Sequence, residues 1–221
     1  MEKYHHIPLE YRKPSAQEIL DNSTNLFNDL NKRRSVREFS NEPVDKQIIE
    51  NIIKAASTAP SGANKQPWHF CAVSSQELKD KIRKAAEEEE KLNYSKRMNE
   101  EWLEDLAPLG TDWQKPFLSI APWLIIMTKK VYDIDENQER SQNYYVNESV
   151  GIACGFLLSA IHQAGLVSLT HTPSPMNFLT KLLGRPENEK AYMLIPIGYP
   201  AKDTTVPDIK RKELEKISSF Y

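Results

Sequence analysis

A compact basic segment, Arg33-Arg34-Ser35-Val36-Arg37, is the first place in the sequence where binding chemistry is concentrated. Guanidinium groups bind phosphate through paired hydrogen bonds, and a neighbouring hydroxyl adds a further contact. The segment therefore predicts a site for an anion. A run of charged residues is more often a solvated surface, and on spacing alone this alternative stays open.

The loop from Ala59 to Pro67, with the sequence APSGANKQP, is the second candidate. Its proline and glycine predict a tight turn, and the backbone N–H groups of such a turn can point at a ligand. The polar side chains around the turn would form a rim. We therefore expect this loop to offer backbone donors to a bound molecule.

Charge and glycine content narrow the classes of protein to which the chain can belong. Its 221 residues include 29 Lys and Arg against 31 Asp and Glu, so the net charge is −2. This balance argues against a nucleic-acid-binding protein, which neutralises phosphates with basic side chains. Only 7 residues are glycine, which leaves little room for a glycine-rich phosphate loop, because an average chain contains roughly 7% glycine.

Cysteine usage and hydropathy predict a soluble protein of a reducing cytoplasm. Cys71 and Cys154 each lie in an apolar run, which favours buried, reduced thiols, and neither belongs to a C-x-x-C pair. We predict no metal site. No apolar stretch reaches the ~18 residues of a membrane helix, and the N-terminal residues lack the apolar core of a signal peptide.

Hydrophobic periodicity predicts short strands separated by helices, which is typical of an α+β or α/β layer. Asp45 is a plausible N-cap, Gly165 is a natural residue to follow the end of a helix, and Pro196 suggests a strand that lies at an edge or bends. The expected strands are 68–73, 123–128, 166–172 and 192–199. The expected helices are 22–31, 143–164 and 176–183, together with one that follows Asp45 and a long charged helix that ends near Asn93.

We do not expect either end of the chain to be stably folded by itself. Residues 1–22 are predicted to be an N-terminal arm, 23–200 a single domain, and 201–221 a polar C-terminal tail. Both ends would be buried if they packed against a second subunit. We therefore infer a homodimer in which the tail crosses the interface.

Two internal segments depart from regular patterns. The apolar pattern decays across 94–115, which predicts a lid or a long excursion with Trp102 and Trp113 as aromatic anchors. The polar stretch 131–142 predicts a loop. Segments of this kind often carry function, because they lie on the surface beside a rigid scaffold.

Several motifs, taken in their order, resemble one protein family. RRSVREFSNEPV followed by TAPSGANKQPWHF is similar to the N-terminal signature of the nitroreductase superfamily of FMN flavoproteins. EEEEKLNYSKRM, NYYVNESVGIACG, LTHTP, KLLGRP and VPDIKRK resemble its iodotyrosine deiodinase branch. The resemblance extends from about residue 28 to about residue 216. It implies a three-layer α+β fold, with a central mixed β-sheet flanked by helices, and a homodimer that exchanges its arms and binds FMN at the interface.

The resemblance also implies which residues bind FMN. The basic segment matches contacts to the phosphate, the ribityl chain and the ring edge, and the tail matches a further phosphate contact. The 60–62 turn matches a loop that borders the flavin across the interface, and 170–172 matches residues beside the ring. These residues are Arg33, Arg34, Ser35, Arg37, Pro60, Ser61, Gly62, Thr170, His171, Thr172 and Arg211.

Thr172 is the residue to which the resemblance gives a catalytic role. Its hydroxyl matches one that approaches flavin N5, where it can stabilise a one-electron-reduced flavin. From periodicity alone, Thr172 is simply a strand-end residue before Pro173. His171 stands where relatives often carry threonine, and we interpret it as a packing or rim residue rather than a proton donor.

The predicted substrate contacts separate the deiodinase branch from other nitroreductases. Glu90, Tyr94 and Lys115 match three residues that hold the ammonium and carboxylate of an amino acid, and the lid closes over it. The amide of Ala63 matches a donor to the substrate's phenolate. We interpret the preceding acidic run, Glu87 to Glu89, as a solvated helix face.

The resemblance implies an FMN enzyme that reductively removes halogen from halotyrosines, in one-electron steps through a flavin semiquinone. One alternative is a broad NAD(P)H-dependent nitroreductase or quinone reductase, which shares the cofactor and the fold. Another is a non-catalytic flavin-binding or amino-acid-binding protein. The sequence names no electron donor, so either NAD(P)H or a separate reductase remains open.

Overall fold

The computed structural model describes residues 4–221. Contacts within the chain divide it into a first unit that ends at Arg33 and a second unit, Arg34–Tyr221. The first unit contains one helix, α1 (Ala16–Lys32), which begins well before the predicted start near residue 22. Ser15 explains the difference, because its hydroxyl accepts from the Glu18 N–H while the Glu18 carboxylate accepts from the Ser15 N–H.

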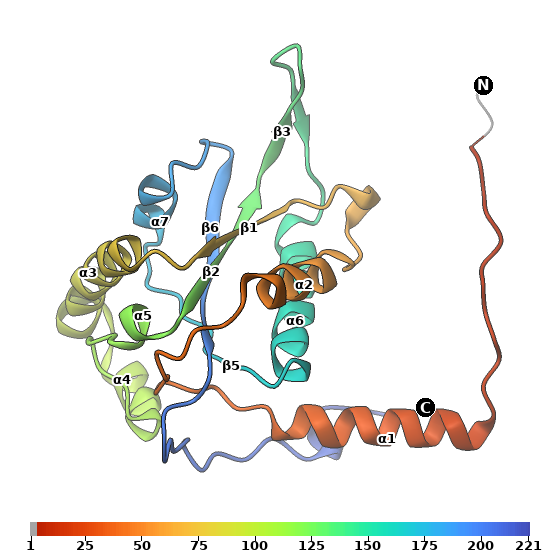
Figure 1. Ribbon diagram of the computed structural model, residues 1–221, viewed down its shortest axis with the longest axis horizontal. Coiled ribbons are helices and arrows are strands. Elements are labelled where there is room, and N and C mark those ends of the chain that lie inside the picture. The colour runs from red at the N-terminus through yellow and green to blue at the C-terminus, as the bar shows by residue number, and fades with distance from the viewer. Residues whose placement is uncertain (1–3) are drawn as a thin grey trace. The chain divides into compact units, whose positions relative to one another are not determined.

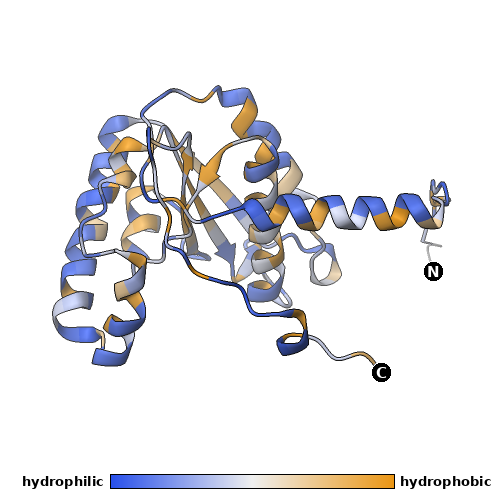
Figure 2. Cartoon of the chain, turned by 90° about the horizontal axis from the view of Figure 1, so that it is seen from below, coloured by the Kyte–Doolittle hydropathy of each residue, from blue (hydrophilic) through white to orange (hydrophobic). Residues whose placement is uncertain are grey.

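Helix α1 carries an apolar stripe that the chain leaves exposed. None of its residues is buried, and Figure 2 shows apolar and polar residues alternating along it. The largest apolar side chains on it are Ile19, Leu20, Leu26 and Phe27, all more than half exposed. A helix with such a stripe gains its stability from packing against another surface.

The second unit is built around a four-stranded sheet in the order β1 (Trp68–Val73), β2 (Trp123–Lys130), β6 (Glu189–Gly198) and β5 (Val167–Ser168). These neighbours pair antiparallel. A parallel bridge between Ser35 and Ser168 adds the parallel pairing that makes the sheet mixed.

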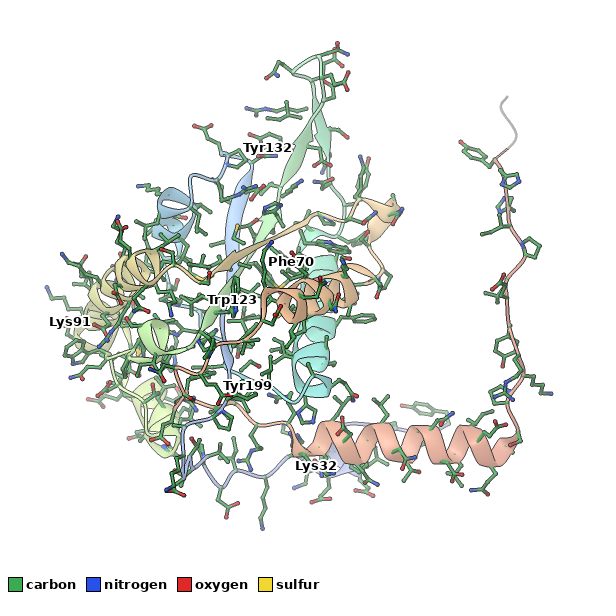
Figure 3. The ribbon with its side chains drawn as sticks, in the orientation of Figure 1. Lys32, Phe70, Lys91, Trp123, Tyr132 and Tyr199 are labelled. Carbon is green, nitrogen blue, oxygen red and sulfur yellow. The ribbon has the colours of Figure 1, made fainter. Side chains whose placement is uncertain are left out.

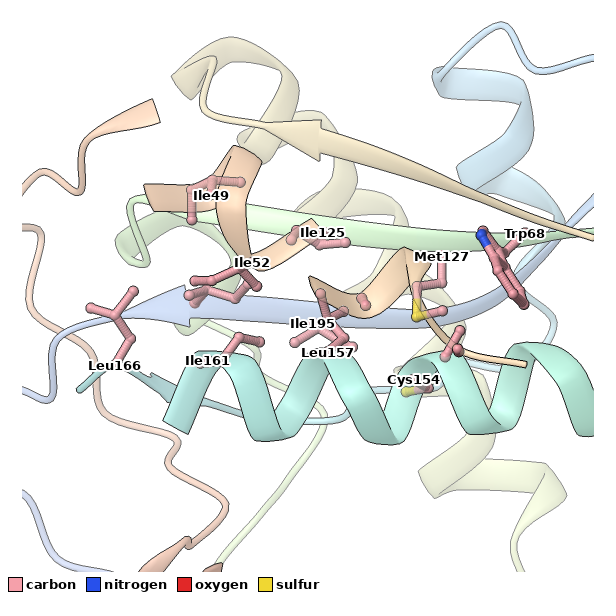
Figure 4. Close-up of a cluster of buried hydrophobic side chains, with 14 of the residues drawn as sticks. Ile49, Ile52, Trp68, Ile125, Met127, Cys154, Leu157, Ile161, Leu166 and Ile195 are labelled. Atoms are coloured by element: carbon pink, nitrogen blue, oxygen red, sulfur yellow. The ribbon is translucent and has the colours of Figure 1, made fainter. Parts of the chain in front are cut away.

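Alternation along β2 builds two cores, one on each face of the sheet. Ile125 and Met127 face one cluster, and Leu124 and Ile126 face the other. Helices α2 (Lys46–Ser57) and α6 (Val146–Gln163) cover the first face, as Figures 1 and 4 show. Helices α3 (Gln76–Leu92), α5 (Phe117–Ile120) and α7 (Asn177–Leu182) contribute to the second. The predicted three-layer arrangement is therefore confirmed.

Local signals fix where several helices begin and end. Asp45 caps α2, since its carboxylate accepts from the Gln47 N–H at 2.6 Å. Helix α3 is capped by Ser75, whose hydroxyl accepts from the Leu78 N–H at 3.4 Å. Gly165 follows the end of α6 in the left-handed conformation, as predicted.

The stretch 131–142 forms a β-hairpin rather than the predicted loop. Strands β3 (Tyr132–Ile134) and β4 (Arg140–Gln142) pair antiparallel, and the hairpin extends beyond the main sheet in Figure 1. The Asp135 carboxylate accepts from the backbone N–H groups of Asn137 and Glu139, which shapes the turn. Arg140 also stacks on the Tyr132 ring, 4.5 Å from its centroid.

The region around Pro196 also differs from the prediction. Strand β6 is internal in the sheet order, whereas Pro196 suggested an edge or a bend. The predicted strand 166–172 is only two residues long, so β5 pairs with Ile197 and Gly198 alone. Beyond β5, this side of β6 continues only as isolated bonds to Leu169 and His171, so no regular ladder is interrupted where Pro196 lacks an N–H.

The 94–115 segment contains short helices instead of irregular chain. A π-helix, η2 (Asn93–Arg97), continues from α3, and α4 (Glu100–Leu106) and the 3₁₀ turn η3 (Ala107–Leu109) follow. Two further 3₁₀ turns are η1 (Gly62–Asn64) and η4 (Leu214–Lys216). Lys91, labelled in Figure 3, places its ammonium 4.1 Å from the Trp113 ring centroid, which supports the predicted anchoring role of this indole.

Candidate active site

Three of the predicted substrate residues lie together in a buried charged cluster, Glu90, Tyr94 and Lys115. The Lys115 Nζ lies 3.5 Å from Glu90 Oε2, and the two side chains are 4% and 8% exposed respectively. The same ammonium lies 5.4 Å from the centroid of the Tyr94 ring. The cluster thus presents an acid, a base and a phenol hydroxyl at one place.

Helix α3 and its π-helical extension position the acid and the phenol. Glu90 lies in the last turn of α3, and Tyr94 follows in η2. A π-helical turn changes the angular spacing of side chains, and such turns are frequent at functional sites. The Tyr94 hydroxyl lies 3.3 Å from the backbone oxygen of Thr111, to which it donates, so the phenol also contacts the far end of the 94–115 segment.

Lys115 is held by its own neighbours and by α3. Its Nζ donates to the Thr111 hydroxyl at 3.2 Å and to the backbone oxygen of Asp112. Its backbone N–H donates to Glu87 Oε1 at 2.8 Å. Glu87 therefore joins the end of the 94–115 segment to the helix on which that segment began.

The prediction that Glu87 and Glu89 belong to a solvated helix face is wrong. Glu87 is half-buried and also accepts from Arg83 Nε at 2.8 Å. Glu89 pairs with Arg97 at 2.8 Å. Only Glu88 of this run is exposed. The local run of like charges gives no sign of these partners, because Lys115, the partner of Glu87, lies 28 positions further along the chain.

Burial shifts the titration of the whole cluster. It raises the pKa of Glu90, although Lys115 and Asn93 oppose the shift. It lowers the pKa of Lys115, although Glu90 opposes the shift, and it raises the pKa of Tyr94. Each charged form thus depends on an opposite charge close by, which is typical of a ligand-binding site.

Two residues of the basic segment, Ser35 and Arg37, line a cavity in the second unit. The cavity measures about 270 Å³, and the rest of its lining is Glu38, the turn at residues 108–110 and the tail at residues 205–207. Arg34 donates to the backbone oxygen of Pro207. Burial lowers the pKa of the Arg37 guanidinium, and Tyr94 opposes this shift. Arg37 therefore connects the cavity electrostatically to the charged cluster.

The two remaining predicted phosphate contacts, Arg33 and Arg211, are not among the residues that line this cavity. Arg33 ends the first unit, where it is the C-cap residue of α1 and donates its backbone N–H to Leu30 O at 3.1 Å. Arg211 is exposed on the C-terminal tail.

The side chains of residues 170–172 point alternately to the two sides of an extended backbone. Thr170 and Thr172 are exposed, and His171 between them is buried. His171 exchanges both backbone hydrogen bonds with Leu194 of β6, which fixes the alternation. Both threonine side chains are therefore open to a ligand that lies against this edge.

His171 faces the protein interior. Its ring lies edge-on to Phe117 at 5.6 Å, and its Nε2 is buried without a hydrogen-bond partner. Burial lowers its pKa to about 3, and the positive charges of Lys115 and Arg37 act in the same direction. Its geometry favours the packing interpretation over that of a proton donor.

The loop with Pro60, Ser61, Gly62 and Ala63 has its own set of contacts within the chain. The Gly62 N–H donates to Ser149 Oγ of α6 at 3.3 Å. Lys65 Nζ donates to Ser141 Oγ of β4 at 2.9 Å. These contacts lie with α6 and the hairpin, so this loop is not joined to the charged cluster by any of them.

Two residues that hold segments carrying predicted site residues have no signal in the spacing of the sequence. The Asn93 side chain donates to the backbone oxygen of Ser174 at 3.0 Å, which joins η2 to the chain just beyond Thr172. Ser149 is buried in the first turn of α6.

Among residues 4–221, no group of three or more His, Cys, Asp or Glu side chains could hold a metal ion, and no helix is long and apolar enough to cross a membrane.

The architecture and the sequence both match one family. The model described as the nitroreductase family matches residues 30–199. The chain is 56% identical over 215 residues to an iodotyrosine deiodinase of Haliscomenobacter hydrossis, with 97% of each chain covered. It is 48% identical over 217 residues to iodotyrosine deiodinase 1 of Homo sapiens, covering 98% of this chain and 75% of that one.

Solved structures agree with the sequence match. The structure of an oxidized iodotyrosine deiodinase bound to FMN and 3-iodo-L-tyrosine superimposes with a TM-score of 0.75 at 31% identity, covering 88% of this chain and 100% of that one. A nitroreductase from Bacteroides fragilis with bound FMN shares the fold, with a TM-score of 0.63 at 20% identity over 89% of this chain and 98% of that one. The chain therefore belongs to the nitroreductase family, and within it to the iodotyrosine deiodinases.

Proposed function

We propose that this chain is an FMN-dependent oxidoreductase that reductively removes halogen from halotyrosines, giving tyrosine and halide. The observation that carries the proposal is the buried charged cluster of Glu90, Tyr94 and Lys115. A buried acid and base suit an amino acid with an ammonium and a carboxylate. The relative that was solved with FMN and 3-iodo-L-tyrosine supports both the cofactor and the substrate class.

The ion pair between Glu90 and Lys115 gives the cluster its selectivity in this proposal. A zwitterion can separate the two side chains and neutralise both of them. A ligand with a single charge would satisfy one side chain and leave the other buried and unpaired. Stranding a buried charge costs about 3–5 kcal/mol, so ligands with one charge are strongly disfavoured.

The residues around the cavity fit FMN. We assign Arg33, Arg34, Ser35, Arg37 and Arg211 to its phosphate, ribityl chain and ring edge. The half-buried Arg37 beside a 270 Å³ cavity supports this assignment, because an anionic group there would regain the interactions that burial removed. FMN supplies the redox chemistry.

We assign Thr170 and Thr172 to the flavin ring, with the Thr172 hydroxyl directed at N5. The predicted contact of His171 with the ring is not retained, because its side chain is buried against Phe117 and its backbone pairs with Leu194. The exposed position of Thr172 at the open edge of the chain supports this role. A hydroxyl at that position would favour electron transfer in single steps. The proposed route of dehalogenation is therefore stepwise.

We propose that the active form is a homodimer in which each site uses both chains. The loop of Pro60, Ser61, Gly62 and Ala63 would border the flavin of the partner subunit, and the Ala63 N–H would bind the substrate's phenolate. The separation of this loop's contacts from those of the charged cluster supports this division. The 94–115 segment would close over the substrate as a lid.

The electron donor in this proposal is NAD(P)H or a separate reductase. The proposed location is a reducing cytoplasm. The unpaired thiols of Cys71 and Cys154 support it, and burial raises the pKa of both.

Ligand-induced quenching of flavin fluorescence tests the function. We expect 3-iodotyrosine to bind at least about 100-fold more tightly than 3-iodotyramine or 3-(3-iodo-4-hydroxyphenyl)propionate, because each of these strands one partner of the pair. Glu90→Gln and Lys115→Ala should lose this preference and keep FMN. A change in the exposed pair on the same helix, Lys81→Ala, serves as the control. Equal affinity for all three ligands would support a broad nitroreductase instead. A purified protein without flavin would refute the proposal that the chain is an FMN-dependent enzyme.

A further inference from the structure

The 61–66 loop has a backbone geometry that is costly to hold. Ala63, Asn64 and Gln66 have φ angles of 49°, 52° and 47°. In this left-handed region a side chain crowds the neighbouring carbonyl oxygen. A residue held in a sparsely populated region costs on the order of 1–3 kcal/mol and stays there only when its surroundings determine it. Hydrogen bonds within the loop and contacts outside it together hold this geometry.

Ser149, in the first turn of α6, contacts the residue that precedes Ala63. Its Oγ accepts from the Gly62 N–H at 3.3 Å, and the residue is 2% exposed. Gly62 is also pressed against the chain that precedes α6. A Cβ on Gly62 would lie 3.0 Å from the Tyr144 backbone oxygen and 3.0 Å from the Tyr145 ring. The hydrogen bond and the close approach together leave Gly62 little freedom.

Two other hydrogen bonds hold the far end of the loop. The Gln66 N–H donates to Ser61 Oγ at 2.9 Å, and Lys65 Nζ donates to Ser141 Oγ at 2.9 Å. Within the loop, the Lys65 N–H donates to Gly62 O at 3.0 Å, so the peptide between Gly62 and Ala63 is held on its carbonyl side by the backbone alone. Ser149 is thus the side chain whose hydrogen bond lies next to that peptide.

We propose that Ser149 is a positioning residue that sets the direction of the Ala63 N–H. This inference rests on the proposed function, in which that N–H binds the substrate's phenolate. Hydrogen bonds weaken steeply when they are misaligned, and bonds to a charged oxygen are about twice as strong as neutral ones. Losing the Ser149 hydroxyl should therefore weaken the binding of phenolates more than that of neutral phenols.

The test compares two ligands that differ in the charge of the phenol. At pH 8 to 9, a halogenated tyrosine is largely a phenolate, whereas tyrosine itself, with a pKa of about 10, is mostly neutral. Dissociation constants are measured by quenching of flavin fluorescence in the intact holoenzyme. We expect Ser149→Ala to weaken 3-iodotyrosine binding about 10-fold and tyrosine binding less than about 2-fold, in line with the strength of a hydrogen bond to a charged group.

Ser159→Ala is the matched control, because Ser159 lies on the same helix and its hydroxyl donates to Gly155 O at 2.9 Å. It should leave both affinities unchanged. Ser149→Cys keeps the size of the side chain with a weaker acceptor, and it should show an intermediate loss if Ser149→Ala fails to fold. Equal losses for both ligands, or no loss for 3-iodotyrosine in a folded variant, would overturn the proposal. A wild-type enzyme that binds no halotyrosine would overturn the proposed function itself.

Discussion

At the scale of single residues, the alternation from Thr170 to Thr172 separates two roles. The exposed threonines can meet a ligand, and the buried His171 fills a space beside Phe117. One backbone pairing, between His171 and Leu194, produces both results. A substitution of an exposed threonine should therefore affect the chemistry of the site, whereas a substitution of His171 should affect stability.

Thr172→Ala should change electron transfer and leave ligand binding nearly intact. Without the hydroxyl near N5, a one-electron-reduced flavin loses a stabilising hydrogen bond, so two-electron reduction becomes dominant. We expect the semiquinone absorbance during reductive titration, with a halotyrosine analogue bound, to fall at least about 5-fold, equivalent to roughly 1 kcal/mol. Thr180→Ala, which removes a hydroxyl from helix α7, is the control. An equal yield of semiquinone in both variants would contradict the role given to Thr172.

His171→Gln should change how stability depends on pH. Because burial lowers the pKa of folded His171 to about 3, from an unfolded value near 6.5, the unfolded state binds the proton more readily. The folded state therefore loses stability as the pH falls below about 6.5 and continues to do so towards 3, by about 1.4 kcal/mol per pH unit. Chemical denaturation at pH 7 and pH 5.5 measures this loss, which should be smaller in His171→Gln than in an exposed control, His6→Gln. The same pH dependence in both variants would contradict the prediction.

At residue scale, spacing alone could predict Glu90 and Tyr94 as neighbours, because they lie four positions apart. It could not predict Glu87 as a partner of Lys115, because that contact joins residues 28 positions apart through the folded path of the chain. Resemblance to a family supplied Lys115 and Ala63. Neither residue belongs to a local pattern that signals binding.

At the scale of elements, the 94–115 segment is held at both ends. Glu87 accepts from the Lys115 N–H at the far end, and Asn93 and Arg97 donate to the Ser174 backbone oxygen near the start. The helices between these points are short, and Trp102 is 52% exposed. In the proposed closure, the segment would move as a flap while its ends stay in place.

Glu87→Ala should loosen this flap without removing a predicted ligand contact. The Lys115 N–H would lose its acceptor, and Lys115 would be held less firmly beside Glu90. We expect 3-iodotyrosine to bind about 10-fold more weakly, since a hydrogen bond to a charged acceptor contributes about 1.5–3 kcal/mol. We also expect faster proteolysis within residues 94–115 in the absence of ligand. The neighbouring Glu88→Ala, which changes an exposed side chain, is the control. Identical affinities and cleavage rates in the two variants would refute this role of Glu87.

Elements with strong local signals were predictable from the sequence. Strand 68–73 has the predicted limits, and Asp45 and Gly165 mark the predicted helix ends. The hairpin at 131–142 was missed because each of its strands has only three residues, so the alternation of Tyr132 and Ile134 is too short to mark a strand. Its turn depends on the Asp135 side chain and its strands on each other.

At the scale of the molecule, several apolar surfaces remain exposed on the described chain. Ile152 and Phe156 lie four positions apart on α6, and each is 42% exposed. The tail exposes Ile209, Leu214 and Ile217. Apolar surfaces of this extent are typical of protein interfaces, and they agree with the homodimer proposed above.

Phe156→Asp should disrupt the proposed dimer, because it would bury a charge in an apolar interface. Multi-angle light scattering should then give the mass of one chain instead of two. FMN should be lost at the same time, since each proposed site needs both chains. Ile134→Asp, on the β3–β4 hairpin, changes a side chain of similar exposure and should leave mass and flavin content unchanged. A dimer that persists in Phe156→Asp would place the interface elsewhere, and a wild-type monomer with bound FMN would refute the shared site.

The anchors at both ends of the 94–115 segment have a thermodynamic consequence. The entropy lost on closing a loop is largely paid when its ends are joined, and it grows only slowly with the length between them. Glu87 and Asn93 hold those ends through contacts within the chain itself. Binding should therefore carry a modest entropic penalty and a small change in heat capacity, in contrast to a disordered segment that folds around its ligand.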